Sequence, residues 1–154
     1  MKKIWTMVLA VVLAVGVLGA CGSDEPGNEP DVKAVAQALQ NGIQFEEALS
    51  ELPQDEIGYY ITLADGVSGV MYISSGSTSE EIAVFLAPDK DTAAKMLANI
   101  KEYLQAQRSS FADYLPEEAK RIDDALVVQK GRYAVLCVSA QTDTAKQIVE
   151  DQFK

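Results

Sequence analysis

Residues 81–89, Glu-Ile-Ala-Val-Phe-Leu-Ala-Pro-Asp, decide the fold of this chain. The stretch from Glu81 to Ala87 is almost entirely apolar, which predicts a strand in the centre of a sheet. Pro88-Asp89 then ends the strand and opens a helix, which Asp89 or Asp91 caps and which runs to about Gln107. A central strand followed directly by a long helix predicts a sheet that packs against helices.

The apolar residues of this helix recur at the spacing of one buried face. They are Ala93, Met96, Leu97, Ile100 and Leu104. Before the central strand, Val67 to Ile73 is predicted as a second strand, and Ser74 to Ser79 joins the two as a hairpin loop. After the helix, Ala125 to Val128 and Arg132 to Ser139 are predicted as strands about a tight turn.

Weaker signals complete the order of elements. Asp31 caps a helix that runs through Gln40, and Ile43 to Leu49 is predicted as a short strand. A short helix near Glu56 to Tyr60 precedes a turn at Asp65-Gly66, whereas Ser109 to Tyr114 is predicted as a loop or a short helical turn.

Pro116 opens another short helix, and Thr142 or Asp143 caps the last one. The inner face of that last helix consists of Ala145, Ile148, Val149 and Phe153. The order of elements predicts a single small α+β domain: a mainly antiparallel sheet of about four to five strands with helices packed on one face.

The first residues resemble the leader of a bacterial lipoprotein. Lys2 and Lys3 precede a 17-residue apolar run, Ile4 to Ala20, which is shorter than the about 20 residues of a spanning helix. The run ends on Leu18-Gly-Ala-Cys21, which matches a lipobox of the form Leu-x-Ala/Gly-Cys. The resemblance implies cleavage between Ala20 and Cys21 and a diacylglyceryl group on the Cys21 sulfur.

These features divide the chain into three parts. Residues 1–20 are predicted to be a signal peptide, residues 21–31 a lipidated cysteine with a flexible acidic tether, and residues 32–154 the α+β domain. The protein is therefore expected on the extracytoplasmic face of the cell membrane, held by the acyl chains on Cys21.

Composition excludes several functions. The chain has 23 acidic and 13 basic residues, and an acidic surface disfavours nucleic acid as a partner. It has no histidine, so the usual general base and the common transition-metal sites are absent, and no metal or other cofactor is expected. Cys137 lies in an apolar run and is predicted to be a core residue.

One polar and aromatic cluster offers a catalytic alternative; it contains Arg108, Phe111, Asp113, Tyr114, Glu117 and Glu118. A carboxylate pair drawn from Asp113, Glu117 and Glu118 would suit a glycoside hydrolase of the envelope. The structural interpretation is favoured: Phe111 and Tyr114 fix the loop, Arg108 pairs with Asp113, and the two glutamates complement a helix start.

Two other pairs of acids carry no metal motif. Asp89 with Asp91, and Asp123 with Asp124, lack the ligand spacing and the glycine turn of a calcium loop. They are predicted to cap helices or to lie on the surface.

The chain also resembles an uncharacterised bacterial lipoprotein family, domain of unknown function 4358. The resemblance rests on Glu81-Ile-Ala-Val84, a helix ending near Gln107-Arg108, Phe111-x-x-Tyr114-x-Pro116 and Lys130-Gly131-x-Tyr133. It implies a small α+β fold and a lipobox leader, and it implies no activity and no catalytic residues.

The sequence thus predicts a lipid-anchored module that binds or scaffolds without catalysis. Its expected partner is an envelope protein or a cell-wall component. The alternative function is a small carboxylate-dependent hydrolase that uses Asp113, Glu117 and Glu118.

Overall fold

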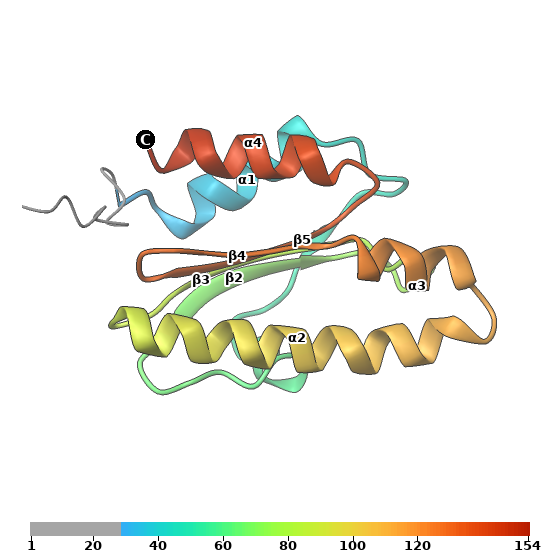
Figure 1. The fold of residues 1–154 in the computed structure, drawn as a ribbon, viewed down its shortest axis with the longest axis horizontal. Coiled ribbons are helices and arrows are strands. Elements are labelled where there is room, and N and C mark those ends of the chain that lie inside the picture. Colours follow the sequence, from blue (N-terminus) through green and yellow to red (C-terminus); the bar gives the residue numbers. More distant parts are fainter. Residues whose placement is uncertain (1–28) are drawn as a thin grey trace, which may run out of the picture.

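The computed structural model describes residues 29–154, so the predicted signal peptide, Cys21 and most of the predicted tether lie outside the described residues. Figure 1 shows the elements in chain order. They are α1 (Val32–Gly42), β1 (Ser50–Glu51), the 3-10 helix η1 (Ile57–Tyr59), β2 (Ser68–Ile73), β3 (Glu81–Leu86), α2 (Lys90–Ala112), α3 (Pro116–Asp123), β4 (Leu126–Lys130), β5 (Tyr133–Val138) and α4 (Thr142–Gln152).

The strands form one five-stranded sheet in the order β1-β2-β3-β5-β4, and every neighbouring pair is antiparallel. β3 is the central strand, as predicted: its first residue, Glu81, is paired with Ile73 of β2 and Val138 of β5. The prediction of a small α+β domain with a mainly antiparallel sheet is therefore confirmed.

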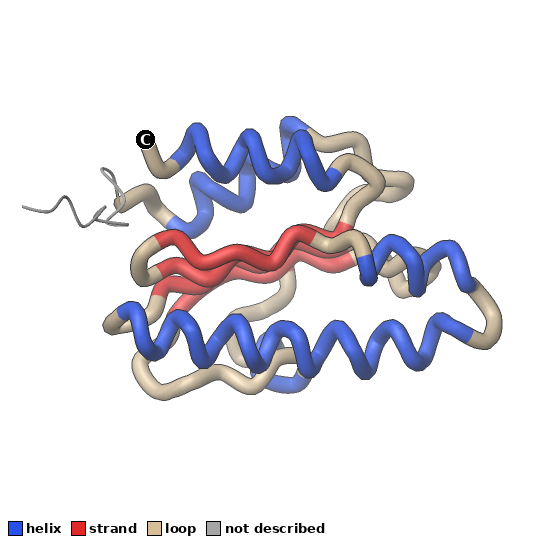
Figure 2. The backbone as a smooth tube through the Cα atoms, viewed as in Figure 1, coloured by secondary structure: helices blue, strands red, loops and turns tan. Residues whose placement is uncertain are grey.

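Helices cover both faces of the sheet, so the prediction of helices on one face is wrong. α1 and α4 lie on one face and α2 on the other, with α3 beside the end of α2 (Figures 1 and 2). The cause is the composition of the inner strands, because β3 and β5 are buried along almost their whole length. A strand that is apolar on both faces needs a covering layer on each.

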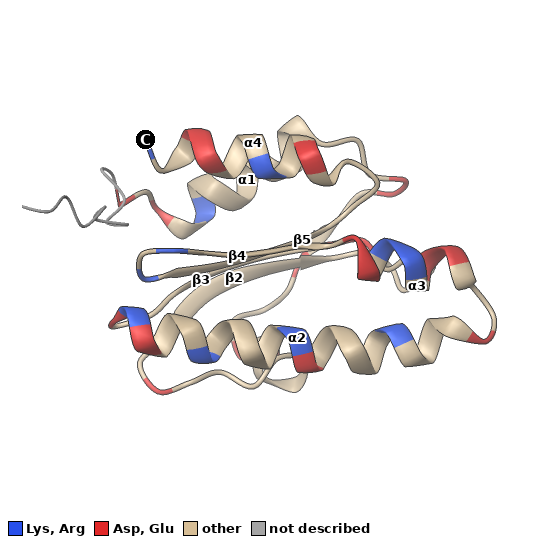
Figure 3. Ribbon diagram, viewed as in Figure 1, with Lys and Arg blue, Asp and Glu red and all other residues tan. Residues whose placement is uncertain are grey.

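Two separate cores follow from this arrangement. Val84 and Val135 pack with Leu39 of α1 and Val149 of α4 on one face. On the other face, Phe85 and Leu136 pack with residues of α2, among them Met96 and Ile100, and with Ile122 of α3. Figure 3 shows that the central strands carry few charged residues, whereas acids and bases are frequent on the helices.

The predicted strand Ile43 to Leu49 is not formed, and the edge strand is Ser50–Glu51 instead. Ile43 and Leu49 are buried, but the chain between them connects α1 with the sheet edge. The backbone of this connecting segment forms a hydrogen bond to a side chain: the amide of Glu46 donates to Glu80 Oε2 at 2.8 Å. The short helix near 56–60 and the turn at Asp65-Gly66 are present, and Gly66 has a φ of 74°.

α2 extends beyond its predicted end, and Ser109 to Ala112 belong to it. The hydroxyls of Ser109 and Ser110 donate to carbonyls four residues earlier. Phe111 is buried in the core, and this packing explains why the helix continues to Ala112. Asp89 rather than Asp91 caps its start, since Asp89 Oδ1 accepts from the Thr92 amide at 2.7 Å.

The other helix starts were predicted with mixed success. Asp31 caps α1 and Pro116 opens α3, as expected. Neither Thr142 nor Asp143 caps α4, because Gln141 precedes the helix and the Thr142 hydroxyl donates to the carbonyl of Asp124. Within residues 29–154, no helix combines the length and apolar character needed to cross a membrane.

Candidate functional site

A small pocket lies where the β2–β3 loop meets the second half of α2. Its volume is about 210 Å³. The loop Ser74–Glu80 and the first residue of β3, Glu81, form part of its wall. The rest of the wall consists of Tyr60, Ile73, Tyr103, Gln107 and Phe111. We call this feature the Glu81 pocket.

Glu81 is an unusual residue for the start of a central strand, because its side chain is interior. It is 2% exposed. The Tyr103 hydroxyl donates to Glu81 Oε2 at 2.7 Å, and Gln107 Nε2 lies 3.4 Å from the same oxygen. Glu81 Oε1 is buried and has no hydrogen-bond partner among the described residues. The carboxyl group is therefore only half satisfied by the protein.

Burial dominates the electrostatics of this group. Loss of water raises the pKa of Glu81 from 4.5 to about 8, and the hydrogen bonds from Tyr103 and Gln107 lower it only partly. The pKa of Tyr103 is also raised, first by burial and then by the charge of Glu81. Such a shift in a pocket is typical of functional sites.

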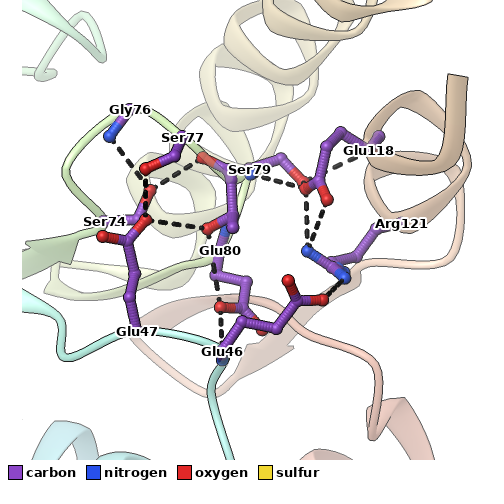
Figure 4. A network of polar contacts seen from close by, with 10 residues as sticks. Glu46, Glu47, Ser74, Gly76, Ser77, Ser79, Glu80, Glu118 and Arg121 are labelled. Atoms are coloured by element: carbon purple, nitrogen blue, oxygen red, sulfur yellow. Dashed lines mark hydrogen bonds and ion pairs between the residues drawn. The ribbon is translucent and has the colours of Figure 1, made fainter. Parts of the chain in front are cut away.

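Glu80 lies beside Glu81 and is 1% exposed, but its carboxylate bonds to a different segment. Its Oε2 accepts from the amide of Glu46 at 2.8 Å, and Thr78 Oγ1 lies 3.5 Å away (Figure 4). Its Oε1 has no partner in the part of the chain that the structure describes. Burial raises the pKa of Glu80, and the Glu46 amide and Arg121 oppose that rise.

Glu118 ties the β2–β3 loop to α3 (Figure 4). Its Oε2 accepts from the amide of Ser79 at 2.7 Å and from the Ser79 hydroxyl at 2.8 Å. The guanidinium of Arg121 donates to both carboxylate oxygens, at 2.8 and 2.7 Å, and also pairs with Glu46. The side chains of Glu118 and Arg121 are only 10% and 12% exposed, so the pair is largely removed from water.

Glu118→Ala should lower the free energy of unfolding by about 3 kcal/mol. The substitution removes a carboxylate partner of the buried Arg121 guanidinium and the acceptor for the Ser79 amide. Glu117→Ala is the matched control: Glu117 is exposed in the same turn, and we expect a change below about 0.5 kcal/mol. Urea unfolding of both variants measures the difference. Equal stabilities would contradict the role assigned to Glu118.

Comparison with known families assigns the domain. Residues 55–139 match a family described as Domain of unknown function (DUF4358). The chain belongs to the DUF4358 family. The matched segment runs from η1 through β5 and includes every wall of the Glu81 pocket, whereas α1, β1 and α4 lie outside it. No curated protein and no solved structure matches the chain.

The residues of the catalytic alternative have separate environments in this DUF4358 domain. Asp113 and Glu117 are exposed, at the end of α2 and in the first turn of α3. Glu118 is buried, and its hydrogen bonds go to Ser79 and Arg121. Its place in the first turn of α3 agrees with the structural interpretation.

Within the same cluster, the predicted pair of Arg108 with Asp113 is wrong. Arg108 Nε donates to Asp123 Oδ1 at 2.6 Å instead, because α3 folds back along α2 and brings its end to Arg108. Phe111 and Tyr114 are in contact, with ring centroids 5.7 Å apart, but they do not fix a loop onto the helix as predicted, because Phe111 lies within α2 and Tyr114 is exposed.

The remaining candidates have structural roles in the DUF4358 domain. Cys137 is buried in the core, as predicted, and burial raises the pKa of its thiol to about 12. Asp89 caps α2, and Asp124 pairs with Lys120. Among residues 29–154, no three acidic or cysteine side chains are grouped so that they would hold a metal ion.

Sequence reasoning missed Glu80 and Glu81 as site residues. The available signal was a pair of acids at the start of a strand that is otherwise apolar on both faces. The first side chain of such a strand is enclosed like the rest of it, and a fully buried glutamate is rare. An acid at that position therefore indicates either a paired charge or a binding site.

Proposed function

We propose that this DUF4358 protein is a lipid-anchored module on the extracytoplasmic face of a cell membrane, and that it binds a partner or ligand without catalysing a reaction. The leader supports the first part, because Leu18-Gly-Ala-Cys21 has the form of a lipobox. Two or more acyl chains on Cys21 are enough for stable attachment to a bilayer. The proposed partner belongs to the envelope, as an envelope protein or a cell-wall component.

The main support for a binding module is the position of the pocket relative to the anchored end. The chain enters the domain beside the β4–β5 turn, where Glu29 pairs with Arg132 and the Pro30 carbonyl accepts from the Tyr133 hydroxyl. The Glu81 pocket lies at the opposite end of β3, about 17 Å away along the strand. A domain held by its N-terminal end would direct this pocket away from the bilayer.

The length of chain between Cys21 and Glu29 is compatible with a domain held at the membrane by its N-terminal end. Cys21 precedes Glu29 by eight residues, which span at most about 28 Å when extended. The domain would therefore stay close to the membrane surface, with its pocket end free for a partner.

The contacts of Glu118 favour binding over hydrolysis. A carboxylate pair for glycoside hydrolysis needs two carboxyl groups that face each other across the bond to be cut. Glu118 instead holds Ser79 and Arg121, and Asp113 and Glu117 are exposed.

The anchoring part of the proposal predicts that Cys21→Ala releases the protein from the membrane pellet or leaves the leader uncut. The reason is that the lipobox resemblance implies acylation of this thiol and cleavage directly before it. Fractionation of native membranes, followed by mass spectrometry of the purified chain, measures both effects. Ser23→Ala is the matched control and should pellet like the wild type. A Cys21→Ala protein that is cleaved normally and still pellets would refute the anchor.

A further inference from the structure

The unsatisfied oxygen of Glu81 indicates what the pocket is built to accept. Buried polar atoms almost always have a hydrogen-bond partner, and an exception calls for a missing group at that position. Glu81 Oε1 has none among the described residues, although Oε2 of the same carboxyl group is held by Tyr103. The ionised carboxylate only accepts hydrogen bonds, so a ligand that pairs with this form is a donor.

The charge around the pocket favours a cation. The wall contains Glu80 and Glu81 but neither lysine nor arginine. The guanidinium of Arg121 is bound by Glu118 and Glu46 (Figure 4), and Arg121 is not among the residues that line the pocket. A positive charge in the pocket would meet the Glu81 carboxyl group, and an anion would be repelled by its ionised form.

The other residues that line the pocket can contact a small apolar part of a ligand next to that charge. Tyr60, Tyr103 and Phe111 contribute aromatic side chains, which bind both alkyl groups and ammonium ions. The volume of about 210 Å³ is below the range of about 300–1,000 Å³ of pockets for drug-sized ligands. The ligand is therefore a small molecule.

We propose that the Glu81 pocket binds a small molecule with a primary ammonium group, which pairs with the Glu81 carboxylate and packs its carbon chain against Tyr60 and Phe111. This inference rests on the proposed binding function and specifies its ligand class. An ammonium ion also favours the ionised form of Glu81, so the bound carboxylate is neutralised by its ligand.

The test uses the full chain in detergent micelles, labelled with ¹³C on the isoleucine δ1 methyl groups. Ile73 lines the pocket and Ile148 lies on α4, so one methyl reports on the site and the other serves as an internal control. The probe is n-butylammonium chloride, and n-butanol and sodium butyrate are its neutral and anionic counterparts. The titration is done at about pH 8.5, where Glu81 is mostly ionised.

We expect n-butylammonium to shift the Ile73 methyl signal to saturation, with half-saturation at about 1–10 mM, and to leave Ile148 unchanged. Glu81→Gln should weaken this binding at least about tenfold, since the neutral amide keeps the shape and loses the charge. Glu117→Gln removes an exposed charge outside the pocket and should bind like the wild type.

Two other results would overturn the inference in different ways. If n-butanol or butyrate shifts Ile73 as strongly as the amine does, the pocket binds ligands but does not select ammonium, and the proposed binding function survives. If none of the probes moves Ile73, or if Glu81→Gln binds n-butylammonium like the wild type, the assignment of Glu81 as the receptor of the amine is wrong. The fate of the Cys21→Ala variant is independent of both results.

Discussion

Glu81→Gln is expected to raise the free energy of unfolding near pH 8 by up to about 5 kcal/mol and to have little effect near pH 4.5. Glu81 is buried, and burial raises its pKa from 4.5 to about 8. The unfolded chain releases this proton near pH 4.5, whereas the folded chain keeps it until about pH 8. Between these values the folded state holds one more proton, so the stability of the wild type falls as pH rises, and above about pH 8 it levels off.

The absence of histidine makes this effect measurable. Histidine is the side chain that ordinarily titrates between pH 5 and 8, and the chain has none. The groups that face Glu81 are Tyr103 and Gln107 from α2, whereas the carboxylate of the neighbouring Glu80 bonds to the Glu46 amide. The pKa of Glu80 is also raised, so Glu80 likewise makes the stability fall as pH rises. The Glu81→Gln variant retains this contribution.

Urea unfolding of the wild type and Glu81→Gln at pH values from about 4.5 to 8.5 measures the difference. The two stability curves should diverge as pH rises, while Glu117→Gln, an exposed control, should follow the wild type. A wild type that is equally stable at both ends of the range would mean that Glu81 is ionised and solvated in the folded protein, contrary to its burial.

Gly69→Ala is expected to lower the free energy of unfolding by about 3 kcal/mol. Gly69 lies in β2 opposite Phe85, and a Cβ atom there would be 2.3 Å from the carbonyl oxygen of Val84 and 2.9 Å from the Phe85 Cα. Both are backbone atoms of the central strand, so they cannot move aside without disturbing the β2–β3 ladder.

Gly58→Ala is the matched control, because nothing lies within 4 Å of the Cβ position at Gly58. We expect a change within about 1 kcal/mol, in the stabilising direction if the lower entropy of the unfolded chain dominates. Thermal or urea unfolding of the two variants gives the comparison. Similar stabilities for Gly69→Ala and Gly58→Ala would contradict the close approach of β2 and β3.

The two cores explain why the pocket lies at one end of the sheet. β3 and β5 are covered by α1 and α4 on one face and by α2 on the other, so the strand interiors are filled with apolar side chains. Space for a ligand remains where β3 begins, between the β2–β3 loop and the last turns of α2. The polar residues there are Glu80, the last residue of the loop, and Glu81, the first residue of β3.

Several features of this protein could be read from short stretches of sequence. The apolar run of β3 and the periodic stripe of α2 determined two of its largest elements, and Asp31, Asp89 and Pro116 marked helix starts. These signals act within a few residues, through capping bonds and through burial of one face or both faces of an element. The family was identified from such local motifs, and its match covers residues 55–139.

The tertiary structure alone decided which helices cover which face, which partner each charge has, and where the pocket lies. Tyr103 and Glu81 are 22 positions apart, and Glu118 and Ser79 are 39 apart. Arg108 pairs with Asp123 rather than with the nearer Asp113 because α3 folds back along α2. Local propensity and periodicity contain no information on such pairings, since the contacts exist only after distant elements have packed together and excluded water.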